Sequence, residues 1–305
     1  MTDPRDPTPA DETRTPQPLP AHGIRPAPRL RSPHVLLPLA FVALTIVAQI
    51  GYPLTTGATR DRITVTIVLS TVCAALAHAT ATRGVRYAVG FAVLVSGVGL
   101  LAEVIGTTTG IPFGCYAYAA DRLGPALLDV PLVIALAWTG GVYPVYVVAG
   151  ILSRRSMVRI ALTATGAVGW DLFLDPQMVA DGQWTWCTVG SGLPGVDSIP
   201  YTNYLGWFGV ALVIAGLLAV WERAAPDPGP EPGSTTLAAP VTLFLWTWLG
   251  SALAHAAFLG LPASAGYGLA GMGVLGVPLL LVAARRFRSP PPAPARDPDS
   301  PAPTR

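Results

Sequence analysis

The sequence predicts an all-α protein, a polytopic membrane helix bundle of about eight transmembrane helices with both termini in the cytoplasm. Its 305 residues are 51% hydrophobic and only 12% charged, and the mean hydropathy is +0.51. An ordinary soluble domain carries about twice that charged fraction. The apolar residues are grouped into runs of about 20, the length that a helix needs to cross a bilayer. The arginines are distributed unevenly around these runs.

Each apolar run is expected to form one helix, because lipid offers the backbone no other hydrogen-bond partner. The runs lie near residues 34–53, 62–81, 84–105, 131–152, 157–176, 201–221, 238–258 and 263–284. The segments outside them, residues 1–32 and 289–305, are rich in Pro and polar residues, so we expect two disordered tails. The transmembrane domain is expected to cover residues 33–288.

The arginines predict the orientation of the helices, because cytoplasmic ends of membrane helices are enriched in basic residues. With the N-terminus in the cytoplasm and eight spans, twelve arginines near the helix ends fall on the cytoplasmic side, against Arg60, Arg62 and Arg122 on the other side. We therefore expect a multi-pass protein of the cell membrane, in contact with the lipid bilayer. The net charge of +2 is too small to indicate a nucleic-acid partner.

Two loops on the non-cytoplasmic side, residues 106–130 and 176–200, are rich in Gly, Pro and aromatic residues. Each loop also holds one cysteine, Cys115 and Cys187. A disulfide between them is permitted outside the cytoplasm but needs a particular geometry, so the sequence leaves the pairing open.

Three carboxyl groups are expected at similar depth near the non-cytoplasmic ends of the helices. Asp171 and Asp175, in the segment GWDLFLDPQ, are four residues apart and therefore lie on one helix face. Glu103 lies at the corresponding end of an earlier run. Acidic groups within membrane helices usually have a function, and neighbouring carboxyls in an apolar site suit general acid–base chemistry. The alternative is an ion pair or, for Asp175 before Pro176, a helix end.

Aromatic residues surround the predicted position of these carboxyls. They include Tyr116, Tyr118, Trp184, Trp186 and Trp207. Such residues commonly anchor a protein at the membrane interface, but here they also suit a wall that stacks on a flat polyene and stabilises a cation. Asn203 could orient a water molecule or a carboxyl, although a turn or capping role is equally compatible with its position.

Other kinds of chemistry are disfavoured by what the sequence lacks. All 19 basic residues are Arg, which excludes lysine-dependent Schiff-base and phosphate-loop chemistry. His78 and His255 have no partner at metal-ligand spacing, so we interpret them as hydrogen-bonding residues between helices. No metal site and no cofactor are expected.

The chain resembles the membrane carotenoid-biosynthesis hydratases, a family that includes the bacterioruberin-pathway hydratases and the carotenoid 1′,2′-hydratases of the CruF type. The resemblance covers roughly residues 35–285. It is carried by Glu103 with GTTTGIPFGCYAYAADRLGP, by Pro131 to Trp138, and by WDLFLDPQ, WTW and IPYTNYLGW in combination. It implies addition of water to the terminal double bond of an acyclic carotenoid, giving a tertiary alcohol, by a hydro-lyase that needs no cofactor. C50 carotenoids of the bacterioruberin type are among the implied substrates, and other enzymes of the pathway are implied partners.

In this reading Asp171 is the preferred acid, and Glu103 or Asp175 is its partner. Two other functions remain open. The DLFLD segment supplies a DxxxD pair of the kind that holds Mg²⁺ in membrane prenyltransferases. A pigment carrier or scaffold would need no reactive groups at all.

Overall fold

The computed structural model describes residues 33–187, 192–225 and 237–288, so the predicted tails lie outside the described residues. Seven α-helices dominate these described ranges. They are α1 (Pro33–Gly51), α2 (Gly57–Thr109), α3 (Leu132–Leu152), α4 (Ser156–Ala180), α5 (Tyr201–Ala224), α6 (Ala238–Ala257) and α7 (Pro262–Arg288). A single 3₁₀ turn, η1 (Tyr52–Leu54), follows α1.

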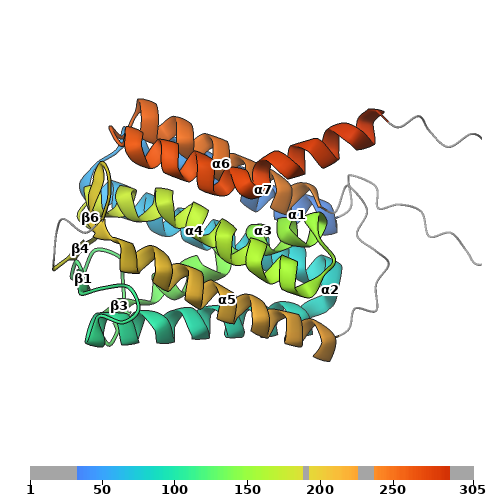
Figure 1. Ribbon diagram of the computed structural model, residues 1–305, viewed down its shortest axis with the longest axis horizontal. Helices are drawn as coiled ribbons and strands as arrows, with labels where there is room; N and C mark the ends of the chain where they lie inside the picture. The colour runs from blue at the N-terminus through green and yellow to red at the C-terminus, as the bar shows by residue number, and fades with distance from the viewer. Residues whose placement is uncertain (1–32, 188–191, 226–236, 289–305) are drawn as a thin grey trace, which may run out of the picture.

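Short strands occupy the loops between the helices. They are β1 (Tyr116–Tyr118), β2 (Ala126–Leu127), β3 (Val130–Pro131), β4 (Trp184–Trp186), β5 (Gly192–Leu193) and β6 (Val196–Pro200). They form three antiparallel pairs, β1 with β4, β2 with β3, and β5 with β6. Figure 1 shows the labelled strands gathered at one end of the bundle, which we call the strand end. The last described helix, α7, finishes at the opposite end.

Helix α2 contains two of the predicted runs and folds back on itself. Gly84 has φ 83° and ψ 163°, which no helix contains and which glycine adopts readily. Asp61 and Glu103, which a straight α-helix would separate by about 60 Å, both lie at the strand end. Asp61 binds Arg122, and Glu103 binds Tyr118. Near the turn, Arg83 pairs with Glu222 at the far end of α5. The α2 segment is thus a helical hairpin that has no loop.

Six of the described helices are long and apolar enough to cross a membrane, namely α1, α2, α3, α4, α5 and α7. In α6, polar residues such as Thr242, Thr247, Ser251 and His255 lower the hydropathy. Large apolar side chains are exposed on the outer faces of the helices, for example Leu205 at 72% and Leu253 at 62%. A multi-pass membrane protein accounts for this surface, because lipid and not water covers it.

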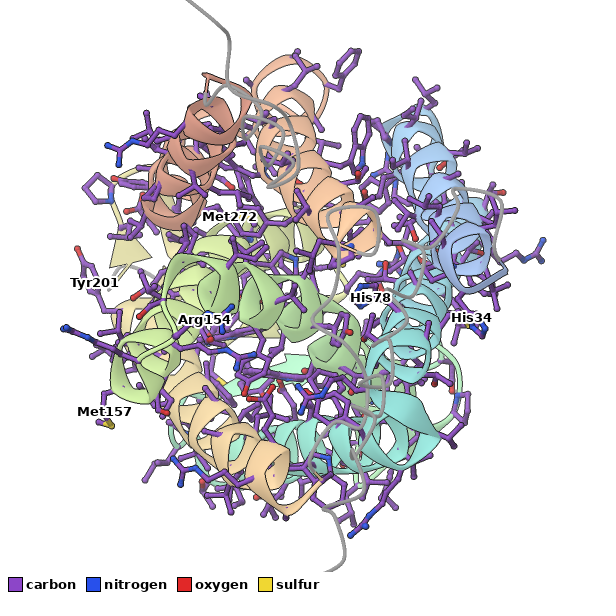
Figure 2. The ribbon with its side chains drawn as sticks, turned by 90° about the vertical axis from the view of Figure 1, so that its right-hand side faces the viewer. His34, His78, Arg154, Met157, Tyr201 and Met272 are labelled. Carbon is purple, nitrogen blue, oxygen red and sulfur yellow. A yellow bond between two sulfur atoms is a disulfide. The ribbon has the colours of Figure 1, made fainter. Side chains whose placement is uncertain are left out.

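Helices α3 and α4 lie at the centre of the bundle, as Figure 2 shows in a view from the end opposite the strands. Much of α3 is buried, including Trp138, Val142 and Tyr146. Helix α4 packs closely on α7, because a Cβ atom added at Gly169 would lie 2.6 Å from the carbonyl carbon of Gly271. Small residues at such positions allow membrane helices to approach each other.

The two membrane histidines connect helices, as the sequence predicts. The His78 Nδ1 atom lies 2.6 Å from the Tyr143 hydroxyl, joining α2 to α3. In α6, His255 contacts Ser264 of α7 at 2.9 Å and Gln177 of α4 at 3.2 Å. Their interpretation as hydrogen-bonding residues between helices is therefore confirmed.

Candidate functional site

A two-stranded ribbon brings the two aromatic loops together at the strand end. In the β1–β4 pair, Tyr116 lies opposite Trp186 and Tyr118 lies opposite Trp184. Alternate residues of a strand point to opposite faces, so these four aromatic side chains share one face. The residues between them, Ala117 and Thr185, are exposed. The ribbon therefore forms an aromatic cover over the helices beneath it.

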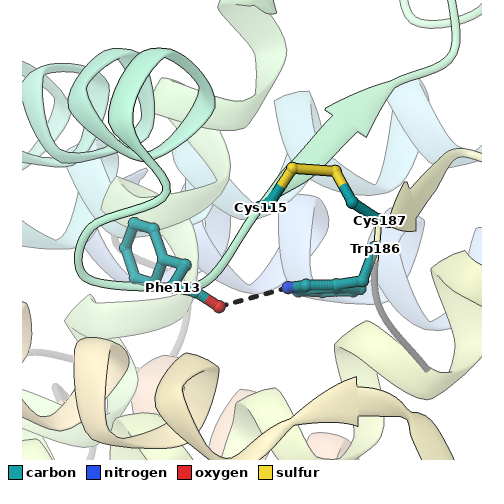
Figure 3. The surroundings of a disulfide bond; sticks show 4 residues. All are labelled: Phe113, Cys115, Trp186 and Cys187. Atoms are coloured by element: carbon teal, nitrogen blue, oxygen red, sulfur yellow. Dashed lines mark hydrogen bonds between the residues drawn. A yellow bond between two sulfur atoms is a disulfide. The ribbon is translucent and has the colours of Figure 1, made fainter. Parts of the chain in front are cut away.

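A disulfide closes the ribbon at one edge. Cys115 is bonded to Cys187, with 5.4 Å between their Cα atoms, and the Cys187 amide donates to the Cys115 carbonyl oxygen at 2.8 Å. Figure 3 shows the neighbouring hydrogen bond from the Trp186 indole to the Phe113 carbonyl oxygen. The pairing that the sequence leaves open is thus present, and it joins the loop after α2 to the loop after α4.

Glu103 lies beneath this cover and accepts hydrogen bonds from three aromatic side chains. Its Oε2 atom accepts from the hydroxyl groups of Tyr116 at 2.5 Å and Tyr118 at 2.8 Å. Its Oε1 atom accepts from the Trp138 indole at 2.9 Å. Burial, and then the neighbouring Glu103, raise the pKa of Tyr116 and Tyr118 far above the usual value of a tyrosine. Both phenols therefore remain protonated and able to donate.

The other two carboxyls form a pair that is bridged by one amide. Asp171 and Asp175 are one turn apart on α4, and the Asn203 side chain of α5 donates to the Oδ2 atoms of both. Asp171 is completely buried, and its Oδ1 atom has no hydrogen-bond partner. Two acidic side chains thus share a single amide donor.

A small cavity of about 50 Å³ separates these two groups of acids, and we call it the carboxyl cavity. Eight of the nine residues that the sequence predicts for the site line it. They are Glu103, Tyr116, Tyr118, Asp175, Trp184, Trp186, Asn203 and Trp207. Asp171 does not line the cavity and reaches it only through Asn203 and Asp175. The catalytic and binding roles of all nine residues remain predictions.

Trp138 is a cavity residue for which the sequence suggests no role. Its indole stacks on that of Trp207, with ring centroids 4.0 Å apart and planes inclined by 17°, while its nitrogen donates to Glu103. A mid-helix tryptophan in an apolar run is typical of packing, so composition alone does not distinguish it. Its place in the motif that resembles the hydratases was the available signal.

A much larger cavity of about 840 Å³ adjoins the carboxyl cavity, and we call it the apolar chamber. It lies between α1, the first half of α2, α3, α4 and α6, and the residues that line it include Ile46, Ile67, Val145, Phe173 and Leu245. The carboxyl cavity thus lies beside a space that suits a lipophilic molecule.

Within the described ranges, no three His, Cys, Asp or Glu side chains are grouped so that they could hold a metal ion. Among the described residues, the hydrogen bonds of Glu103, Asp171 and Asp175 come only from neutral groups. The site can therefore offer protons, hydrogen bonds and aromatic faces.

Comparison with known proteins points in one direction. The profile of the family described as "Carotenoid biosynthesis protein" matches residues 62–275. A bisanhydrobacterioruberin hydratase of Haloarcula japonica is 32% identical to this chain over 123 residues. That match covers 39% of this chain and 38% of the relative, so the chain spans well under half of the length of this curated protein. No solved structure matches the chain.

Proposed function

The chain belongs to the family of carotenoid biosynthesis proteins, and from this premise we propose that it is a hydratase of acyclic carotenoids. It would add water across the terminal double bond of the polyene and yield a tertiary alcohol. The hydratase from Haloarcula japonica supports this reaction, although the match covers only 38% of that protein. The observation that carries the proposal is that Glu103 and Asp175 line one cavity from two different helices, next to a large apolar space.

The reaction needs an acid on one side of the double bond and a base on the other. A proton from the Asp171–Asp175 pair forms a C–H bond with the π electrons at the less substituted carbon, leaving a tertiary cation. A water oxygen forms the new C–O bond at that cation, and Glu103 takes the proton that the water releases. The sum is one alkene and one water giving one alcohol, and exchange with solvent restores both carboxyls. Positioned acids and bases of this kind accelerate reactions by about 10² to 10⁴.

Hydrogen bonding supports this assignment of acid and base. An ionised carboxylate only accepts hydrogen bonds, and Glu103 is met by three donors. In the aspartate pair, Asn203 bridges the two Oδ2 atoms and the Oδ1 atom of Asp171 has no partner, and two buried negative charges side by side are unfavourable. The pair therefore suits a shared proton. Because Asp175 lines the cavity and Asp171 does not, the proton leaves from Asp175.

The aromatic walls would stabilise the cation between the two steps. Trp184, Trp186 and Trp207 line the cavity, and the face of an aromatic ring attracts a positive charge within about 6 Å of its centre. The same walls exclude bulk water. A cation formed there meets the water beside Glu103 before it meets solvent.

Product analysis in a lycopene-producing host tests the proposal. Expression of the full chain should add the mass of one or two waters to the pigment, depending on whether one or both ends react. A gain of a prenyl unit that depends on Mg²⁺ would instead establish the prenyltransferase function, and an unchanged pigment would leave a carrier or scaffold. Bacterioruberin-type C50 precursors offered in the same way test whether the substrates of this chain include those that the relative's name implies.

We further propose that the chain crosses the cell membrane eight times, with the two halves of α2 and the helix α6 each counted as a span. Both termini then face the cytoplasm and the strand end faces outward. A reporter that is active only outside the cytoplasm, inserted within residues 188–191, should be active. The same reporter within residues 226–236 should be silent, and the reverse result would reject this orientation.

A further inference from the structure

We propose that the apolar chamber is the binding site for the hydrocarbon chain of the substrate, and that the polyene passes from there into the carboxyl cavity with its terminal double bond first. This inference rests on the proposed function, because it assigns a place to the substrate of that reaction. It also makes the chamber the part of the molecule that selects a long, lipophilic ligand.

The size of the two cavities separates their roles. The carboxyl cavity, at about 50 Å³, has room for a few water molecules or for the branched end of a chain. It cannot enclose a polyene. The apolar chamber is about 840 Å³, within the range of about 300 to 1,000 Å³ that is usual for ligand sites. The body of the ligand must therefore lie outside the carboxyl cavity, and the chamber adjoins it.

The two cavities share a wall, and this wall marks the path of the ligand. Five residues line both cavities, namely Thr64, Val68, Ala137, Leu174 and Met178. Four of the five are apolar and the fifth is a small threonine, so no charged group stands in the wall between the two cavities. Leu174 directly precedes Asp175 on α4. A chain end that passes this wall therefore arrives beside the proposed proton donor.

The lining of the chamber fits a hydrocarbon. Its described lining residues include no Asp, Glu, Lys, Arg or His. Two of the polar lining groups already satisfy each other, because the Trp246 indole donates to Gln49 at 2.6 Å. The remaining surface is mostly aliphatic and aromatic. Burial of such surface stabilises a complex with an apolar ligand.

The chamber has exposed lining residues on both α1 and α6. Several residues that line it are also exposed, including Ile50 at 52%, Leu249 at 48% and Leu253 at 62%. In a membrane this surface faces lipid, which is where a carotenoid dissolves. The ligand can therefore enter sideways from the bilayer and does not have to cross water.

A matched pair of substitutions on α6 tests the chamber. Ala254 lines the chamber, whereas Ala256 is exposed and lines neither cavity. The full-length variants Ala254→Phe and Ala256→Phe are purified from a lycopene-producing host in mild detergent. The pigment bound per protein is measured by visible absorbance, and the extracted pigment is analysed by mass. Ala254→Phe should lower bound pigment at least fivefold and hydration with it, while Ala256→Phe should leave both unchanged.

A third variant tests the passage separately. Ala137 lines both cavities at the shared wall, so Ala137→Phe blocks the connection between them and leaves the rest of the chamber intact. The variant should therefore retain pigment and lose at least tenfold in hydration. Circular dichroism checks the fold, and the smaller change Ala254→Val replaces Ala254→Phe if that protein does not insert. Retention of pigment and hydration by the Ala254 variant would overturn the proposal, as would an unmodified protein that binds no pigment. A third outcome is possible: bound pigment falls in the Ala254 variant, but none of the proteins, including the unmodified one, makes hydrated product. That result would keep the chamber as a binding site and reject the hydratase function.

Discussion

At the end of the bundle opposite the strands, Glu222 is balanced by two arginines, whereas at the strand end Glu103 contacts no cation among the described residues. Arg159 binds both carboxylate oxygens of Glu222, at 2.7 and 3.2 Å, and Arg83 adds a contact at 3.2 Å. Glu103 is instead held by two phenols and an indole. Glu103 is buried and Glu222 is largely buried, but only Glu222 has its charge neutralised by arginine.

This difference separates a structural cluster from the one proposed to be reactive. An ion pair in an apolar setting is stable only when its charges are compensated and its hydrogen bonds are made. The Glu222 cluster meets the requirement of charge compensation and ties α5 to α2 and α4. The acids of the carboxyl cavity do not, and uncompensated acids inside a membrane domain are expected to have a function. Substitutions at the two ends should therefore affect different properties of the protein.

The largest effect on activity is expected from Asp175→Asn. The amide has nearly the same shape as the acid but cannot deliver a proton, so hydration should fall by about 10² to 10⁴. Product formation per inserted protein in a lycopene-producing host measures this. Asp181→Asn is the matched control at the same end of α4, because Asp181 pairs with Arg60 and Arg122 and lines neither cavity. Equal losses of hydration in both variants would remove the distinction between the acids of the cavity and the acids that pair with arginine.

A loss of about 10²-fold is expected from Glu103→Gln. The amide cannot take the proton from water, and its NH₂ group would face some of the three donors that now point at the carboxylate. Bound pigment should remain, since the apolar chamber is untouched. The yields of hydrated product and of co-purified pigment, measured on the same preparation, check both parts. Full activity would exclude Glu103 as the base.

A smaller loss, about tenfold, is expected from Trp138→Phe. The change removes one hydrogen bond to Glu103 and keeps an aromatic ring against Trp207, and a hydrogen bond to a charged group contributes about 1.5 to 3 kcal/mol. The initial rate of product formation is the measurement. A variant as inactive as Glu103→Gln would show that the indole does more than hold the carboxylate.

The smallest effect on activity is expected from Glu222→Gln at the opposite end. The rate should stay within about twofold, because the cluster lies away from both cavities, while the free energy of unfolding should fall by about 1 to 3 kcal/mol as two arginines lose their counter-charge. Thermal unfolding in detergent and product yield are measured together. A variant that keeps its stability but loses its activity would contradict the comparison.

Much of the fold could be predicted from hydropathy, since each predicted run falls on a described helix. The joining of two runs in α2 could not, because a single glycine with positive φ at residue 84 turns the chain between the two runs. Six helices meet the length and hydropathy of a span, so the predicted eight depends on how α2 and α6 are counted.

The residues that make up the candidate site could be predicted, but which of them face the cavity and which lie buried behind them could not. One-turn spacing places Asp171 and Asp175 on the same face, yet only packing against α5 decides that Asp175 and not Asp171 meets the cavity. Glu103 is expected near the interface, and its burial, with 5% of its surface exposed, comes from the ribbon that covers it. The strands of that ribbon are only three residues long, too short for alternation to stand out.

The bond between Cys115 and Cys187 has a practical consequence for the expression of this protein. Cystine persists only where thiols are kept oxidised, such as the bacterial periplasm or the lumen of the endoplasmic reticulum. An expression host should therefore be chosen for its capacity to oxidise thiols. In hosts that lack this capacity, the yield of folded protein should be limited by the fraction in which this bond forms and not by the amount that is synthesised.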